Sequence, residues 1–136
     1  MNAGLLIITH GNIGKMLVQS ALDIVGVCPL PMLELSVPSG CDPESVLHEA
    51  ERATDRLDKG GGVLVLTDMY GATPSNIACR LRDLRRVRVV AGLNLPMLIR
   101  VMNYPELGLD ELAGKAISGG RDGVTACRQE QEAHAK

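Results

Sequence analysis

Apolar residues along the chain form short continuous or alternating runs, separated by stretches in which they recur every three or four positions. The runs are typical of strands, and the wider spacing is typical of helices. Strands are therefore predicted at Gly4–Thr9, Met32–Val37, Val63–Leu66 and Val87–Gly92. Helices are predicted at residues 12–27, after Asp42-Pro43, after Thr73-Pro74, from about residue 93, and from Leu109 to a break at Gly119-Gly120.

Local signals indicate where these elements begin and end. Pro29 and Pro31 are expected to end the first helix. Asp42 and Thr73 are suited to cap the second and third helices, because each precedes a proline that fits the first helical position. Residues 124–127 are a candidate for a short, final antiparallel strand.

Strands that alternate with helices require a parallel sheet with right-handed crossovers. The expected fold class is α/β: a single doubly wound, mainly parallel sheet of order 2-1-3-4, with helices on both faces. One domain is expected at residues 1–127, followed by a polar tail at 128–136. The strand order reverses between the first and third strands, so a ligand crevice is expected at their carboxyl ends.

Both strands that flank this crevice run into an ionisable residue. The first strand leads to His10 and the third to Asp68, and a helix is expected to begin soon after each. A carboxylate that accepts a hydrogen bond from one imidazole nitrogen leaves the lone pair of the other nitrogen facing outward. Free N–H groups at the two helix N-termini favour an anion. The sequence therefore predicts a histidine that receives and releases a phosphoryl group.

Residues beside this pair are candidates to bind the phosphoryl group. Gly71 allows a tight turn, and Thr73 and Ser75 offer hydroxyl donors. The full set of candidate phosphoryl-binding residues is Gly11, Gly71, Ala72, Thr73 and Ser75. Asn94 and Pro96, at the start of the short helix after the fourth strand, are candidate pocket residues.

Composition and charge narrow the possible functions. A net charge of −2 gives no indication of nucleic-acid binding, and a chain with two Tyr, no Phe and no Trp has no platform for stacking bases. No apolar run approaches the length of a membrane span, and no basic region precedes the first one, so a cytoplasmic protein without membrane insertion is expected. The four cysteines form no C-x-x-C pair and are interpreted as reduced packing residues; a zinc site at Cys28, Cys41 and His48 fits no usual spacing.

The chain has no Walker motif, no Gly-rich dinucleotide loop and no carboxylate cluster for magnesium. ATP bound by this chain is therefore not expected to be the phosphoryl donor, and no cofactor or metal is expected. A phosphorylated partner protein is the predicted donor.

Three motifs together resemble the IIA component of the mannose class in the bacterial phosphoenolpyruvate-dependent phosphotransferase system. That family has His-Gly after the first strand, Asp-Leu-Phe-Gly-Gly-Thr-Pro-x-Asn after the third, and Gly-Val-Asn-Leu-Pro-Met after the fourth. The corresponding segments here are His10-Gly11, residues 68–76 (DMYGATPSN) and residues 92–97 (GLNLPM). The resemblance covers residues 3–127.

The resemblance implies a phosphotransferase component in which His10 is the phosphohistidine and Asp68 orients it. It implies the phosphocarrier HPr as donor, a separate IIB component or a regulatory protein as acceptor, and a homodimer that can exchange a C-terminal strand, here residues 124–127. Ala72 replaces the second glycine of the motif and is expected to be tolerated unless its φ is positive.

Alternative functions remain open from the sequence. The relay can serve a sugar permease or a purely regulatory target, and the sugar is not specified. An IIA-like subunit of a dihydroxyacetone kinase uses a similar histidine. A flavodoxin-like module that binds a nucleotide or flavin has the same fold class, although the scarcity of aromatic residues disfavours flavin.

Overall fold

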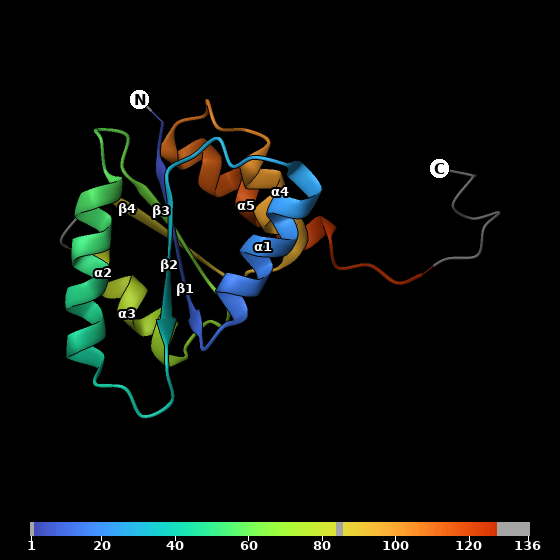
Figure 1. Cartoon of the computed structure of the whole chain (residues 1–136). Helices are drawn as coiled ribbons and strands as arrows, with labels where there is room; N and C mark the ends of the chain where they lie inside the picture. Colours follow the sequence, from blue (N-terminus) through green and yellow to red (C-terminus); the bar gives the residue numbers. More distant parts are fainter. Residues whose placement is uncertain (1, 84–85, 128–136) are drawn as a thin grey trace.

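The computed structural model describes residues 2–83 and 86–127 (Figure 1). Four strands and five helices follow one another along this part of the chain, alternating as far as α4: β1 (Gly4–His10), α1 (Ile13–Val25), β2 (Met32–Val37), α2 (Pro43–Leu57), β3 (Val63–Thr67), α3 (Thr73–Leu81), β4 (Val87–Ala91), α4 (Leu95–Met102) and α5 (Leu109–Asp122). The strands form one sheet in the order β2-β1-β3-β4, and all pairs are parallel. The predicted fold class and strand order are confirmed.

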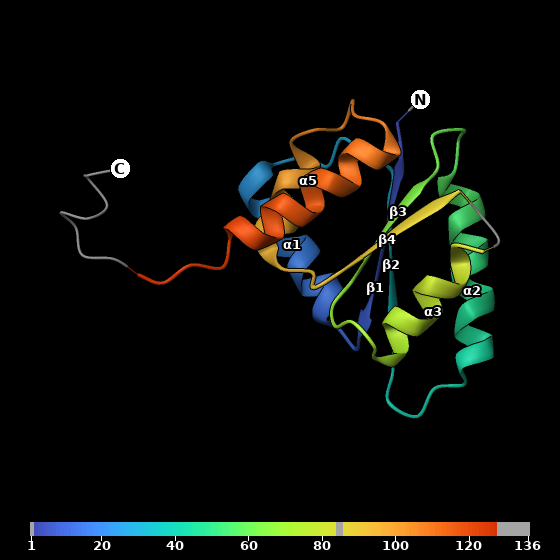
Figure 2. The same ribbon diagram turned by 180° about the vertical axis from the view of Figure 1, so that it is seen from behind.

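Helices cover both faces of the sheet (Figures 1 and 2). Along β1, Leu5 and Ile7 belong to the hydrophobic cluster formed with α1, α4 and α5. Leu6 and Ile8 point to the opposite face and belong to the cluster formed with α2 and α3. Because β1 and β3 are the two central strands, their apolar side chains are fully buried, which explains why both sequences read as continuous apolar runs.

Two helix boundaries differ from the sequence predictions. α1 ends at Val25, before the prolines, because Gly26 adopts a φ of 100° and donates its N–H to the carbonyl of Leu22 at 2.7 Å. The N-cap of α3 is Ala72, so Thr73 and Pro74 are the first two residues of that helix. Thr73 is therefore not the cap that its side chain suggested.

The predicted break at Gly119-Gly120 is wrong, since α5 continues through both glycines to Asp122. A methyl group at Gly119 would lie 2.6 Å from Cβ of Arg100, and one at Gly120 would lie 2.8 Å from Cε of Met97. These glycines therefore allow α5 to pack closely on α4, which is a packing role that outweighs their poor helix propensity.

The predicted final strand is not formed within the chain. Residues 124–127 have no strand structure, are exposed, and extend away from the sheet (Figure 1). The predicted tail at 128–136 lies outside the described residues, as do Leu84, expected on the buried side of the third helix, and Arg85.

Candidate functional site

His10 and Asp68 are brought together at the carboxyl ends of β1 and β3. Nδ1 of His10 lies 2.8 Å from Oδ2 of Asp68, and the backbone N–H of His10 donates to the same oxygen at 3.1 Å. The second carboxylate oxygen accepts the backbone N–H of Met69 at 3.0 Å. The two side chains therefore meet as the strand order predicted, and Nε2 of His10 is the nitrogen left outside this contact.

The turn after β3 holds Asp68 in place. Gly71 has a φ of 86°, and the N–H of Ala72 donates to the carbonyl of Met69 at 3.3 Å. Ala72 has a φ of −82°, a conformation that any residue adopts, so the methyl group that replaces the family glycine causes no backbone strain. The expectation that Ala72 is tolerated is met.

The electrostatic environment keeps Asp68 ionised. Partial burial acts to raise the pKa of the Asp68 carboxyl, but hydrogen bonds from the side chain and backbone of His10, together with the charge of that ring, lower the pKa below its usual value of 3.8. The Asp68 side chain is 11% exposed and that of His10 is 44% exposed. The carboxylate is thus a shielded support for an imidazole that remains accessible to a partner.

A cleft of about 490 Å³ adjoins His10. It is lined by His10, Gly11, residues 37–41, Pro43 and Thr73. Pro43 and Thr73 are the first residues of α2 and α3, so α3 borders the cleft as expected, and α2 borders it in place of the expected first helix. An α1 amide near the start of that helix is already used, because the N–H of Gly14 donates to the hydroxyl of Thr9 at 2.8 Å.

The predicted phosphoryl-binding residues lie at different distances from this cleft. Gly11 and Thr73 line it, and Gly71 and Ala72 lie in the turn that follows Asp68. Ser75 is 1% exposed, in the first turn of α3, and is not among the lining residues.

Comparison with known proteins shows the family to which this chain belongs. The sequence model of the EIIA-man family, described as the fructose IIA component of the phosphotransferase system (PTS), matches residues 4–116. The chain belongs to this family. It is a IIA component of the mannose family of the phosphotransferase system, as the three motifs indicated, and the components of this family are phosphotransferase proteins that carry a phosphohistidine.

Relatives and solved structures agree with this assignment. The mannose-specific EIIAB component of the PTS of Escherichia coli K12 is 31% identical over 131 residues, which are 94% of this chain and 40% of that protein. The chain thus spans two fifths of the length of that relative. The mannose/sorbose-specific IIA subunit of Enterococcus faecalis superposes with a TM-score of 0.84 at 28% identity, covering 95% of this chain and 97% of that one. The EIIA component of Streptococcus agalactiae gives a TM-score of 0.79 at 25% identity, with 91% and 96% covered.

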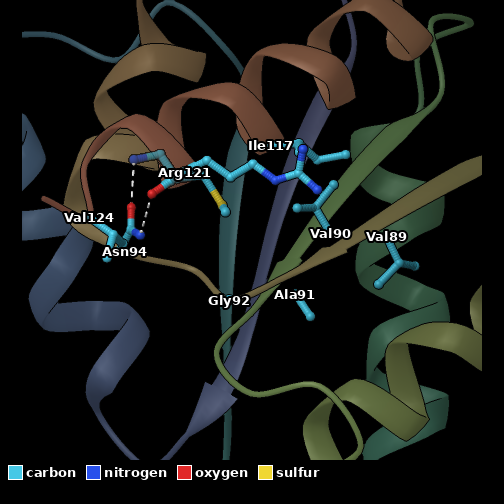
Figure 3. Close-up of a pocket in the computed structure, with 10 residues that line it drawn as sticks. Val89, Val90, Ala91, Gly92, Asn94, Ile117, Arg121 and Val124 are labelled. Carbon is cyan, nitrogen blue, oxygen red and sulfur yellow. Dashed lines mark hydrogen bonds between the residues drawn. The ribbon is translucent and has the colours of Figure 1, made fainter.

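In this IIA protein a second cavity, of about 470 Å³, lies beside the edge strand β4 and is also lined by residues of α4 and α5 (Figure 3). Asn94 lines it, and its amide is fixed by accepting the N–H of Met97 at 2.9 Å and donating to the carbonyl of Gly120 at 3.1 Å. Figure 3 shows Arg121 reaching across this cavity toward Ile117. Asn94 is thus both the cap of α4 and a cavity residue, whereas Pro96 is exposed and does not line the cavity.

Sequence reasoning missed the turn that forms one wall of the His10 cleft. Residues 38–41 follow β2, and among them the sequence indicates only a packing role for Cys41. The parallel pairing of β1 with β2 aligns His10 with Val37, so the turn after Val37 must lie beside His10. Once the order 2-1-3-4 is accepted, this adjacency is available from the sequence.

Other charged groups of the IIA protein make local contacts. Arg80, at the end of α3, pairs with Glu44 at 2.7 Å, and Arg88, in β4, pairs with Asp110 at 2.7 Å. His48 is exposed, and its Nδ1 lies 3.3 Å from Oε1 of Glu51 on the same helix. Within residues 2–83 and 86–127, no three His, Cys, Asp or Glu side chains are grouped for a metal ion, and no helix has the length and apolarity needed to cross a membrane.

Proposed function

We propose that Nε2 of His10 accepts a phosphoryl group from phosphorylated HPr and passes it to a IIB component or a regulatory protein. The observation that supports this proposal is the 2.8 Å contact between Nδ1 of His10 and Asp68 at the mouth of a cleft. This contact fixes the proton on Nδ1 and leaves the Nε2 lone pair as the nucleophile. Family membership supplies the reaction class.

The bonds and charges of this transfer are accounted for by the two histidines and Asp68, without a cofactor. The Nε2 lone pair forms a bond to phosphorus while the bond between phosphorus and the donor's imidazole nitrogen breaks, and that electron pair returns to the donor ring. The positive charge that the donor ring loses appears on the His10 ring. The Asp68 carboxylate, 2.8 Å away, stabilises that charge through the Nδ1 proton. Transfer to the acceptor is the same step in reverse, with a new nucleophile.

Support for the partners comes from the family. The E. coli relative is named as an EIIAB component, which points to a IIB acceptor in the same class of system. Transfer to a regulatory protein and transfer toward a sugar permease use the same chemistry at His10. We propose that this protein is cytoplasmic in either role. Identifying the protein that removes the phosphoryl group from His10 distinguishes the two roles.

The proposal is tested by incubating the purified protein with enzyme I, HPr and ³²P-phosphoenolpyruvate. The protein is expected to gain one acid-labile, alkali-stable phosphate. The His10→Ala variant should gain none, and His48→Ala, which removes an exposed histidine outside the cleft, should be labelled as the wild type is. Equal labelling of His10→Ala, or a wild-type protein that stays unlabelled, would exclude the relay.

We further propose that the protein is a homodimer that uses the open edge of β4. Among residues 2–83 and 86–127, β4 pairs only with β3, and an unpaired edge is a template for another strand. The cavity of Figure 3 runs along this edge, and residues 124–127 are exposed and available to pair with a second copy. Light scattering should give twice the chain mass, and truncation after Gly123 should give a monomer. A monomeric full-length chain, or a truncated chain that remains dimeric, would contradict this arrangement.

A further inference from the structure

The turn Pro38–Cys41 is fixed directly beside the phosphorylation site. Val37, the last residue of β2, is paired with His10, and its carbonyl accepts the N–H of Gly11 at 3.1 Å. The chain that continues from Val37 therefore starts next to the imidazole. All four residues of the turn line the same cleft as His10.

The turn is a defined structure held at both ends. The N–H of Cys41 donates to the carbonyl of Pro38 at 3.2 Å, and Gly40 has a φ of 76°, as the third position of a type II turn requires. α2 begins immediately afterwards, where Asp42 accepts the N–H of Glu44 at 3.3 Å. The position of the turn's second residue, Ser39, is thus set by hydrogen bonds on both sides.

Ser39 and Thr73 carry hydroxyls without partners on two sides of His10. In the described parts of the chain neither hydroxyl makes a hydrogen bond, whereas the nearby Ser45 donates to Asp42 at 3.0 Å. Ser39 follows β2, and Thr73 follows β3 at the start of α3. Because β1 lies between β2 and β3, Ser39 and Thr73 line the cleft from opposite sides of the strand that carries His10.

The residues that line the cleft indicate which groups can bind a phosphoryl group there. Among the described residues that line it there is no lysine or arginine, so the donors that this part of the chain offers beside His10 are hydroxyls and backbone N–H groups. Thr73, the first residue of α3, offers its hydroxyl and its N–H on one side, since the next residue, Pro74, has no N–H. A matching donor is needed on the other side, because a phosphoryl group in transfer spreads its charge over three equatorial oxygens.

We propose that Ser39 is a phosphoryl-binding residue, whose hydroxyl donates a hydrogen bond to the phosphoryl group as it reaches and occupies Nε2 of His10. This inference rests on the proposed function and adds a ligand from the β2–α2 turn to the candidates on the β3–α3 side. The hydroxyl contacts the group in transfer, so its loss acts on the transfer step more than on the docking of the partner protein. A hydrogen bond to a charged group accounts for a change in rate of about 10- to 100-fold.

The experiment compares Ser39→Ala with Ser45→Ala, a control that removes a neighbouring hydroxyl bound to Asp42 outside the cleft. Transfer from phosphorylated HPr is followed in single-turnover kinetics, and the phosphohistidine is titrated by ³¹P NMR. Ser39→Ala should slow transfer at saturating HPr by about 10-fold or more. It should also raise the pH at which the phosphoryl group becomes a dianion, because a donor that favours the dianion is lost.

Ser39→Thr keeps the hydroxyl, so its transfer rate and the pH at which its phosphoryl group becomes a dianion should lie close to those of the wild type. Ser45→Ala should change neither quantity. A Ser39→Ala protein with the wild-type transfer rate, or with slower transfer but an unchanged ³¹P titration, would overturn the assignment. Failure of this inference is distinguishable from failure of the relay, because the wild-type protein must first be labelled on His10 for any comparison to be made. An unlabelled wild type overturns both.

Discussion

Replacing Thr67 with valine should stabilise the protein. Thr67 ends β3, is 0% exposed, and carries the one buried side-chain polar atom in the described residues that has no hydrogen-bond partner. It continues the alternation of Val63 and Val65, which face α2 and α3. Its hydroxyl is therefore buried beside an apolar cluster with nothing to bind.

The size of the effect follows from the cost of an unsatisfied buried polar group, which is about 1–3 kcal/mol. Valine has nearly the same shape and removes that cost without opening a cavity. For a domain of this size, about 1 kcal/mol corresponds to a rise of about 4 °C in Tm. We therefore expect Thr67→Val to raise the free energy of unfolding by at least about 1 kcal/mol and the Tm by about 4 °C or more.

Thr9→Val provides a matched control with the opposite sign. Thr9 is also buried, but its hydroxyl accepts the N–H of Gly14 at 2.8 Å. Its loss leaves a buried amide without an acceptor and should destabilise the protein by about 1–3 kcal/mol. Urea unfolding followed by circular dichroism measures both variants. If Thr67→Val is no more stable than the wild type, the hydroxyl has a partner in solution and the reasoning fails.

Three further predictions concern glycines and Asp68. Gly119→Ala should destabilise the protein by about 1–3 kcal/mol, because the added methyl group overlaps α4. Gly114→Ala adds a methyl group in open space on the same helix and should stabilise the protein by about 0.5–1 kcal/mol. Thermal unfolding of both variants measures this difference in sign. Gly71→Ala should cost about 1–2 kcal/mol, since its φ is 86°, while Ala72→Gly should have little effect on urea unfolding. The folded-state pKa of Asp68 is lowered, so the contribution of this carboxylate to stability is complete well above pH 3.8 and is lost as the pH falls below that value. The difference in the free energy of unfolding between the wild type and Asp68→Asn should therefore shrink from pH 7 to pH 3.

The sheet order and the meeting of His10 with Asp68 were predictable because both depend on strong, regular signals. Continuous apolar runs identify the central strands, and right-handed crossovers leave few ways to arrange four parallel strands. The position of each ionisable residue at a strand end then fixes its place in space. The proximity of the two side chains follows from topology, and the structure adds the 2.8 Å contact between Nδ1 of His10 and Asp68.

The errors arose where packing outweighs local preference. Gly119 and Gly120 have the lowest helix propensity after proline, but the close approach of α5 to α4 requires them. Thr73 is a good capping residue by its side chain, yet the turn at Gly71 places the cap one residue earlier, at Ala72. Such shifts of one residue depend on the length of a turn, which the apolar pattern does not encode.

A relay must bind a phosphoryl group without retaining it, and the His10 cleft meets both conditions under the proposed function. Asp68 stabilises the charged ring, but at about 6 Å it repels each phosphoryl charge by about 3 kcal/mol at an effective dielectric near 20. A lysine or arginine in the cleft would offset this repulsion and turn the phosphohistidine into a stable product. Hydroxyls such as those of Ser39 and Thr73 orient the phosphoryl oxygens and contribute no net charge. Introducing a cation, as in Ser39→Lys, should therefore slow transfer from His10 to the acceptor more than it slows phosphorylation of His10 by HPr. The rates of the two half-reactions, measured separately, test this prediction. Equal effects on both rates would mean that the charge of the cleft does not control release.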